Sequence, residues 1–293
     1  MNMLTTNNKT LIYSTVRAEI EPKYKILYIA LSGSRARELH SPDSDVDIKV
    51  IVSTHESEYF LQKELASFCH NMTLKLPKNS KNSENLEFKM EATIMDFQKA
   101  FKYANETNWA ILLVLAGHEI YCDLDFKDSA NYLRCVYKES KNQKIIIQSI
   151  VGQVHSTAKR RLYLKGLSKF PKTIEVKYFV ECIYLVLLVR CLYHGHDPVD
   201  NYTIDKLIQF IKNDEQGLVL DLVALRKKDR LTEIEITDKH IILFTTLMKE
   251  IDEYLIEILK LKNDAEQKNT IKIEMEKYLY ANRKHILKQE CTE

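Results

Sequence analysis

The 293-residue chain is poor in the two residues that interrupt helices, with only six glycines and five prolines. This scarcity excludes the collagen-like and low-complexity disordered classes and favours a helix-rich fold. Net charge is also nearly absent, at +2, so composition alone does not indicate a nucleic-acid binder. Any surface for a polyanion must therefore be local.

Paired cysteines and long apolar runs are missing as well. The six cysteines include no C-x-x-C pair, which argues against a zinc site and against a disulfide framework. Because the first residues lack an apolar signal segment, we expect reduced thiols in a cytoplasmic protein. The most apolar stretch, residues 178–193, contains Glu181 and Arg190. It therefore predicts a buried helix and no membrane partner.

Strand patterns are confined to the first part of the chain. Three segments show apolar runs or a two-residue alternation: Lys25–Leu31, Val46–Val52 and Leu86–Ile94. Residues 10–22 and 56–70 are predicted to be helical, and residues 74–85 a surface loop. Asp96 is predicted to be the N-cap of a further helix.

Helical periodicity dominates after about residue 130. Five segments carry it: 143–168, 174–194, 203–213, 216–228 and 238–262. We therefore predict an α+β fold, with a small mixed β-sheet and flanking helices in residues 1–130. An all-helical domain is predicted for residues 131–293, and the boundary is expected between 124 and 145.

Between the first two predicted strands lies an unusual set of polar residues. Gly33 and Ser34 follow the first strand, and Asp45 and Asp47 open the second after ten intervening residues. A two-residue period places both aspartates on one face, and Glu91 lies on the polar face of the third strand. Carboxylates held this close repel each other, and a divalent cation commonly compensates.

Such a set favours metal-dependent phosphoryl transfer. Three oxygen donors suit Mg²⁺ (or Mn²⁺), which also binds substrate phosphates. Backbone amides of a Gly33-Ser34 turn can hold a phosphate. Arg35 and Arg37 are close enough in sequence to reach the same anion. One metal would activate a hydroxyl and a second would hold the leaving group. The alternative is a turn that aspartate side chains stabilise without any metal.

The ordered residues Gly33-Ser34 and Asp45-Val46-Asp47 resemble the signature of the DNA polymerase β nucleotidyltransferase superfamily. The longer stretch GSRARELHSPDSDVDIKVIV is most similar to its RNA-ligase-associated branch, predicted nucleotidyltransferases of RNA repair. Residues 91–115 and 176–208 continue that likeness into the helical half.

The resemblance implies roles for individual residues. Gly33 and Ser34 would bind the nucleotide phosphates, and Lys177 would meet the triphosphate in the helical half. Asp45 and Asp47 would ligate metal.

Glu91 would be the third carboxylate in this scheme. That position is more usually an aspartate in the family, and Asp96 is the alternative. An arginine expected a few residues after Lys177 is missing, which affects nucleotide or substrate handling rather than the carboxylate set.

A basic segment, AKRRLYLKGLSKFPK, indicates the acceptor. Lys159, Arg160, Arg161 and Lys165 alternate with aromatics and can bind an RNA backbone, although a solvated helix face explains them equally well. With the resemblance, this favours transfer of a nucleoside monophosphate from an NTP such as ATP to RNA. The helical domain would bind nucleotide and acceptor. The alternatives are a small-molecule or protein acceptor, and an inactive nucleotide- or RNA-binding relative.

Overall fold

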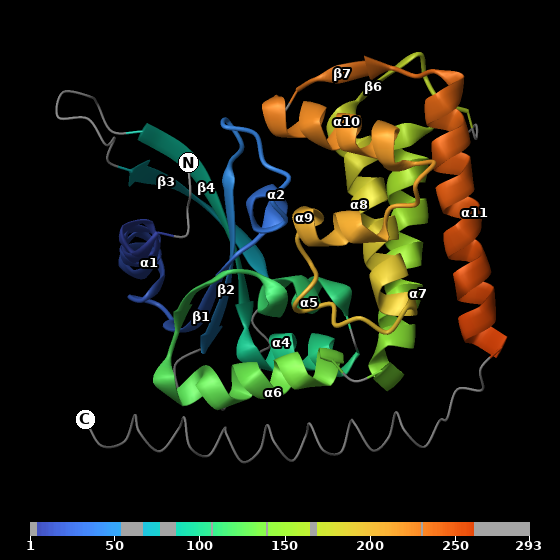
Figure 1. Cartoon of the computed structure of the whole chain (residues 1–293). Helices are drawn as coiled ribbons and strands as arrows, with labels where there is room; N and C mark the ends of the chain where they lie inside the picture. The colour runs from blue at the N-terminus through green and yellow to red at the C-terminus, as the bar shows by residue number, and fades with distance from the viewer. Residues whose placement is uncertain are drawn as a thin grey trace. The chain divides into compact units, whose positions relative to one another are not determined.

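A computed structural model describes residues 5–53, 67–76, 86–106, 108–138, 140–164, 169–229 and 231–260 (Figure 1). The described chain packs as two compact units. The first contains the residues up to Gly33 and Asp45–Val136, and the second contains Ser34–Ser44 and Tyr137–Asn263. The predicted division into residues 1–130 and 131–293 stays a prediction.

The first unit is built on a five-stranded sheet in the order β3-β4-β2-β1-β5. Its strands are β1 (Lys25–Leu31), β2 (Val46–Ser53), β3 (Phe68–Leu76), β4 (Leu86–Asp96) and β5 (Glu119–Cys122). β2 and β4 are parallel, and the other neighbouring strands are antiparallel. All of β1 after Lys25 is buried, as expected for an interior strand covered on both faces.

Helices flank this sheet. They are α1 (Thr6–Ile20), α4 (Phe97–Asn105), α5 (Trp109–Ala116) and α6 (Lys127–Lys138), whereas the short α2 (Gly33–Ala36) belongs to the second unit from Ser34 on. A four-residue spacing puts Ile12, Val16 and Ile20 on the buried face of α1, which ends before Pro22. Asp96 caps α4 by accepting a hydrogen bond from the Gln98 amide at 2.7 Å, so that prediction is confirmed.

The second unit is mainly helical (Figure 1). Its elements are α7 (Ser140–Thr157), a π-helical turn (Ala158–Leu162), α8 (Val176–Tyr193), α9 (Ile204–Leu207), α10 (Gln216–Lys228) and α11 (Asp238–Lys260). α8 is the central helix, because Cys182–Leu192 is buried on every side. The buried guanidinium of Arg190 on α8 lies 2.7 Å from Glu215 and 2.7 Å from Glu250. Glu215 precedes α10 and Glu250 lies within α11, so these ion pairs connect both helices to α8.

The predicted α+β class is confirmed, with a mixed sheet followed by a helical region. Several details differ. Residues 68–70 and 74–76 belong to β3, although they were predicted as helix and loop; residues 56–66 and 77–85 lie outside the described part. β5 was not predicted. The helical region also contains a two-stranded ribbon of β6 (Thr173–Glu175) and β7 (Glu233–Glu235), so it is not all helical.

Two expectations from composition can also be compared with the structure. Within the described ranges, no helix combines the length and apolar character needed to cross a bilayer. The described cysteines, which exclude Cys291, are free thiols. Residues 178–193 fall within buried α8, as predicted.

Candidate active site

Two carboxylates meet where β2 and β4 run side by side. In the parallel register, Asp47 lies directly beside Glu91. Register partners in a sheet share a face, so these side chains lie on the same side. Asp45 immediately precedes β2; it and Asp47 are partly exposed, and Glu91 is exposed. The pairing of β2 with β4 thus brings Glu91 beside Asp47, and the metal-binding role of the carboxylates stays a prediction.

Gly33 makes room for one of these carboxylates. Its φ is +64°, in the left-handed region that favours glycine. A Cβ at this position would lie 1.9 Å from Asp47 Oδ2, an impossible contact. The amide of Ser32 donates to the carbonyl of Asp47 at 2.8 Å, which keeps the end of β1 beside β2. The end of β1 and the carboxylate of Asp47 are therefore in direct contact.

Lys49 is a residue of this face that sequence reasoning missed. Its ammonium donates to Thr93 Oγ1 at 2.6 Å, and Thr93 is two positions after Glu91 on β4. Burial lowers the pKa of Lys49, while the thiol of Cys69 and the carboxylates of Asp47 and Glu91 oppose that shift. A half-buried cation thus offsets part of the carboxylate charge. Its position two residues after Asp47 is the signal that would have found it.

Arg35 and Ser34 belong to the turn Ser34–Ser44, which packs with the second unit. The Ser34 carbonyl accepts from the Leu39 amide at 2.8 Å. Arg35 is 4% exposed, and its Nε donates to the Ser44 carbonyl at 3.1 Å, with Nη2 donating to the same oxygen. The predicted phosphate contact of Arg35 stays a prediction; the structure engages its guanidinium with backbone.

Lys177 lies in the first turn of α8. It forms a 2.6 Å ion pair with Glu175, and that hydrogen bond raises the pKa of Lys177. Its ammonium lies 4.7 Å from the centroid of the Tyr178 ring, and the guanidinium of Arg161 lies 5.1 Å from the same centroid. The predicted contact with triphosphate is not tested.

The predicted RNA-binding lysines and arginines are partly described. Lys159, Arg160 and Arg161 are exposed on the π-helical turn that follows α7. Lys165 lies outside the described residues.

Residues 14–103 match the family model described as a nucleotidyltransferase domain. This range contains Gly33, Asp45, Asp47 and Glu91. The chain carries a nucleotidyltransferase domain. The prediction of a nucleotidyltransferase enzyme is thereby confirmed at the level of this domain.

A nucleotidyltransferase-like protein from Exiguobacterium sibiricum 255-15 has a solved structure that is similar over 87% of this chain and 80% of that chain. The two are 11% identical, and the TM-score is 0.28. No curated protein matches the chain.

The donor chemistry of the nucleotidyltransferase domain fits a hard divalent cation. Mg²⁺ is commonly held by one or two carboxylates plus substrate phosphates, and Asp47 and Glu91 supply two neighbouring carboxylates. The missing Cβ of Gly33 leaves the space that the Asp47 carboxylate fills. Over the described ranges, no group of three or more His, Cys, Asp or Glu side chains is placed to hold a metal ion.

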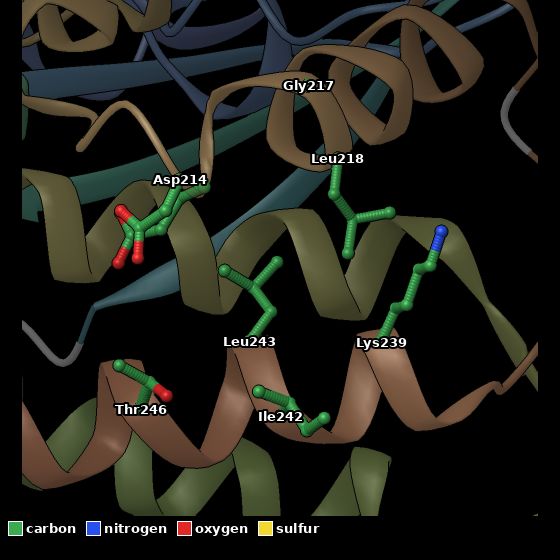
Figure 2. Close-up of a pocket in the computed structure, with 8 residues that line it drawn as sticks. Asp214, Gly217, Leu218, Lys239, Ile242, Leu243 and Thr246 are labelled. Atoms are coloured by element: carbon green, nitrogen blue, oxygen red, sulfur yellow. The ribbon is translucent and has the colours of Figure 1, made fainter.

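A separate cavity of about 420 Å³ lies in the second unit between α10 and α11. Figure 2 shows Leu218, Ile242 and Leu243 around it, with Asp214 and Lys239 nearer its two ends. None of the predicted site residues lines this cavity.

Proposed function

We propose that this protein is a metal-dependent nucleotidyltransferase that moves a nucleoside monophosphate from an NTP to a hydroxyl of RNA, in RNA repair or end modification. The observation that most supports the chemistry is the Asp47–Glu91 pair beside Gly33. The family-model match over residues 14–103 supports nucleotidyl transfer itself.

In the proposed reaction, the acceptor oxygen attacks the α-phosphorus while the bond to the pyrophosphate oxygen breaks. Glu91 either accepts the hydroxyl proton or helps to hold the ion that acidifies that hydroxyl, since its carboxylate is exposed on the sheet face. Amides at Gly33 and the hydroxyl of Ser34 orient the phosphates. A divalent ion held by Asp47 and the substrate phosphates, with Asp45 and Glu91 drawn towards it on binding, would lower the pKa of the attacking hydroxyl and offset charge on the leaving group.

The first experiment removes the charge of both aspartates while preserving their shape. In the double variant Asp45→Asn/Asp47→Asn, we expect no transfer of labelled NTP, with an unchanged circular dichroism spectrum. Asp221→Asn is the matched control, because Asp221 is exposed on α10. Retained transfer in the double variant would exclude this site.

The RNA acceptor is supported by the charge of the π-helical turn after α7. Exposed Lys159, Arg160 and Arg161 are suited to contact phosphates, and such contacts release counterions from the nucleic acid. Arg161 is additionally held over the Tyr178 ring, which limits the entropy lost on binding.

A triple glutamine variant of Lys159, Arg160 and Arg161 tests this acceptor. We expect weaker RNA binding, and a slope of log K against log salt that is shallower by about 0.7 for each phosphate that these side chains neutralise in the wild type. NTP binding should be unchanged. A triple glutamine variant of exposed Lys127, Lys239 and Lys249 controls for net charge. An unchanged slope in the first triple variant would exclude this turn as the RNA-binding segment.

One observation favours a second candidate, a nucleotide- or RNA-binding relative without activity. Lys49 offsets the carboxylate charge without a metal, so the face is tolerable in a protein that performs no transfer. Labelled NTPs should be screened against total RNA, protein and small molecules. Metal-dependent NTP binding without turnover on any of them supports this candidate, whereas labelling of a small molecule or a protein identifies a different acceptor.

A further inference from the structure

The turn Ser34–Ser44 connects β1 and β2 of the first unit, yet it packs with the second unit. The chain therefore leaves the first unit between Gly33 and Ser34, and it returns between Ser44 and Asp45. Each of these two crossing points adjoins a residue of the proposed site. The contacts that hold the turn in place therefore affect the positions of Gly33, Ser34 and Asp45.

Arg37 anchors the turn to the helices of the second unit. Its guanidinium lies 3.5 Å from Glu181 and 5.0 Å from the centroid of the Tyr184 ring, both on α8. Its carbonyl accepts a hydrogen bond from the Ile204 amide at 3.0 Å, at the start of α9. Both the side chain and the backbone of Arg37 are thus fixed by the helical unit.

The far end of the turn has a polar network of its own. The amide of Ser41 donates to Ser44 Oγ at 3.0 Å, and the Ser41 hydroxyl donates to Asp43 at 2.6 Å. Arg226 of α10 reaches Ser41 Oγ at 3.5 Å. Glu38 in this turn has a φ of +60°, a strained value for a side-chain-bearing residue. Such a residue persists only where its surroundings determine the backbone.

Arg35 joins the two ends of the turn. It directly follows Ser34, and its Nε and Nη2 both donate to the carbonyl of Ser44, which directly precedes Asp45. The side chain is 4% exposed, so this charge-assisted contact is shielded from competing water. One guanidinium thereby fixes the two crossing points relative to each other.

We propose that Arg35 is a positioning residue that holds Ser34 and Asp45 in the geometry that nucleotidyl transfer requires, and that it does not bind phosphate. This inference rests on the proposed function. A misplacement of about 1 Å in reacting groups can cost about 100-fold in rate, so a loosened turn should act on kcat. Affinity for NTP should change little, because the charge of Arg35 is directed at backbone.

The variants Arg35→Met and Arg35→Lys separate positioning from phosphate binding. We expect both to lower kcat by about 10- to 100-fold, because a lysine ammonium does not reproduce the two-donor fork. The dissociation constant of NTP should stay within about threefold, a change of under 1 kcal/mol. Arg17→Met on α1 is the matched control, since Arg17 is an exposed arginine of the first unit.

Hydrogen exchange supplies a readout that does not depend on catalysis. The Ser32 amide bonds to Asp47 and the Leu39 amide bonds to Ser34, so both report on the ends of the turn. We expect both amides to exchange faster in the Arg35 variants and to be unchanged in Arg17→Met. If Arg35→Met does not fold, Arg35→Lys carries both measurements.

Three outcomes overturn the proposal. The first is NTP binding that weakens tenfold or more in Arg35→Met and recovers in Arg35→Lys, which identifies a phosphate ligand. The second is unchanged exchange at Ser32 and Leu39. The third is lower thermal stability with unchanged kcat, which identifies a purely structural contact. If the wild-type protein transfers no nucleotide, the proposed function has failed, and the exchange measurement alone decides whether Arg35 braces the turn.

Discussion

Replacing Gly33 by alanine tests the contact on which the proposed site depends. The added Cβ would lie 1.9 Å from Oδ2, 2.7 Å from Cγ and 2.9 Å from Cβ of Asp47. The whole side chain of Asp47 is therefore in the way, so a change of rotamer alone does not relieve the overlap. We expect Asp47 and the end of β1 to move apart in Gly33→Ala.

Two costs contribute to the loss of stability. An alanine held at a φ of +64° costs roughly 1–2 kcal/mol relative to glycine. Moving Asp47 away from the end of β1 weakens the hydrogen bond from the Ser32 amide to the Asp47 carbonyl, which adds roughly 1 kcal/mol. We therefore expect the free energy of unfolding to fall by about 2–3 kcal/mol. Transfer activity should fall by about 100-fold, because a carboxylate of the site is displaced.

The assay uses the only tryptophan, Trp109, which lies on α5 of the first unit. Its fluorescence in urea reports unfolding of that unit, and circular dichroism reports the helices. Gly195→Ala is the matched control: its φ is +76°, but a Cβ there meets no atom within 4 Å. It should show the backbone cost of roughly 1–2 kcal/mol without loss of transfer. If Gly33→Ala retains full transfer activity at a comparable loss of stability, the placement of Asp47 against Gly33 is refuted.

Three further predictions follow from the charged groups. Arg190→Met leaves buried Glu215 without its cation and leaves Glu250 with Lys212 alone, which should cost about 3–5 kcal/mol in urea unfolding. Burial alone would raise the pKa of Glu250, but hydrogen bonds, that from Arg190 foremost, outweigh it and lower the pKa to about 2. This depressed pKa stabilises the protein above pH 4.5, and acid titration should show that stability lost as the pH falls from 4.5 towards 2. In Lys49→Met, the carboxylates lose their compensating cation. Saturating Mg²⁺ should therefore increase the thermal stability of the variant by about 1 kcal/mol more than it increases that of the wild type. Equal Mg²⁺ dependence in both proteins would contradict this.

Much of the sheet could be predicted because its central strands are strongly patterned. β1 has the predicted bounds, and β2 and β4 start at the predicted residues. Burial on one face gives the start of β2 a two-residue alternation, and burial on both faces gives β1 a continuous apolar run. β3 could not be predicted, because only Met72 and Leu74 of its described side chains are buried, and its polar residues resemble a loop. Its pairing with β4 overrides that weak local pattern.

Helices of the second unit were predicted well where their ends carry local signals. α10 has the predicted bounds, and α11 begins where predicted. The predicted helix over 203–213 is instead α9 followed by a 3₁₀ turn, Ile208–Phe210. The ribbon of β6 and β7 could not be foreseen, since each strand has three residues and exists only through its partner.

The candidate site shows the same limit. Two-residue spacing was sufficient to place Asp47 on a polar face, and pairing with β4 brings Glu91 beside it. The attachment of Arg35 to Ser44 could not be derived, because it depends on how an eleven-residue turn closes rather than on any period. The sequence Gly-Ser-Arg is the same whether the arginine side chain binds phosphate or a backbone carbonyl.

The face containing Asp47 also explains how repelling carboxylates are tolerated before any ion binds. Like charges on neighbouring strands are destabilising, and burying a lysine beside them is unfavourable by itself. Together they compensate: the ammonium of Lys49 is held by Thr93 on the strand of Glu91, so its charge stays beside both carboxylates. A divalent cation that binds there with a nucleotide, as proposed, would therefore compete with a resident charge. Its binding should depend on the phosphates that accompany it, because they add the negative charge that Lys49 has already offset on the protein.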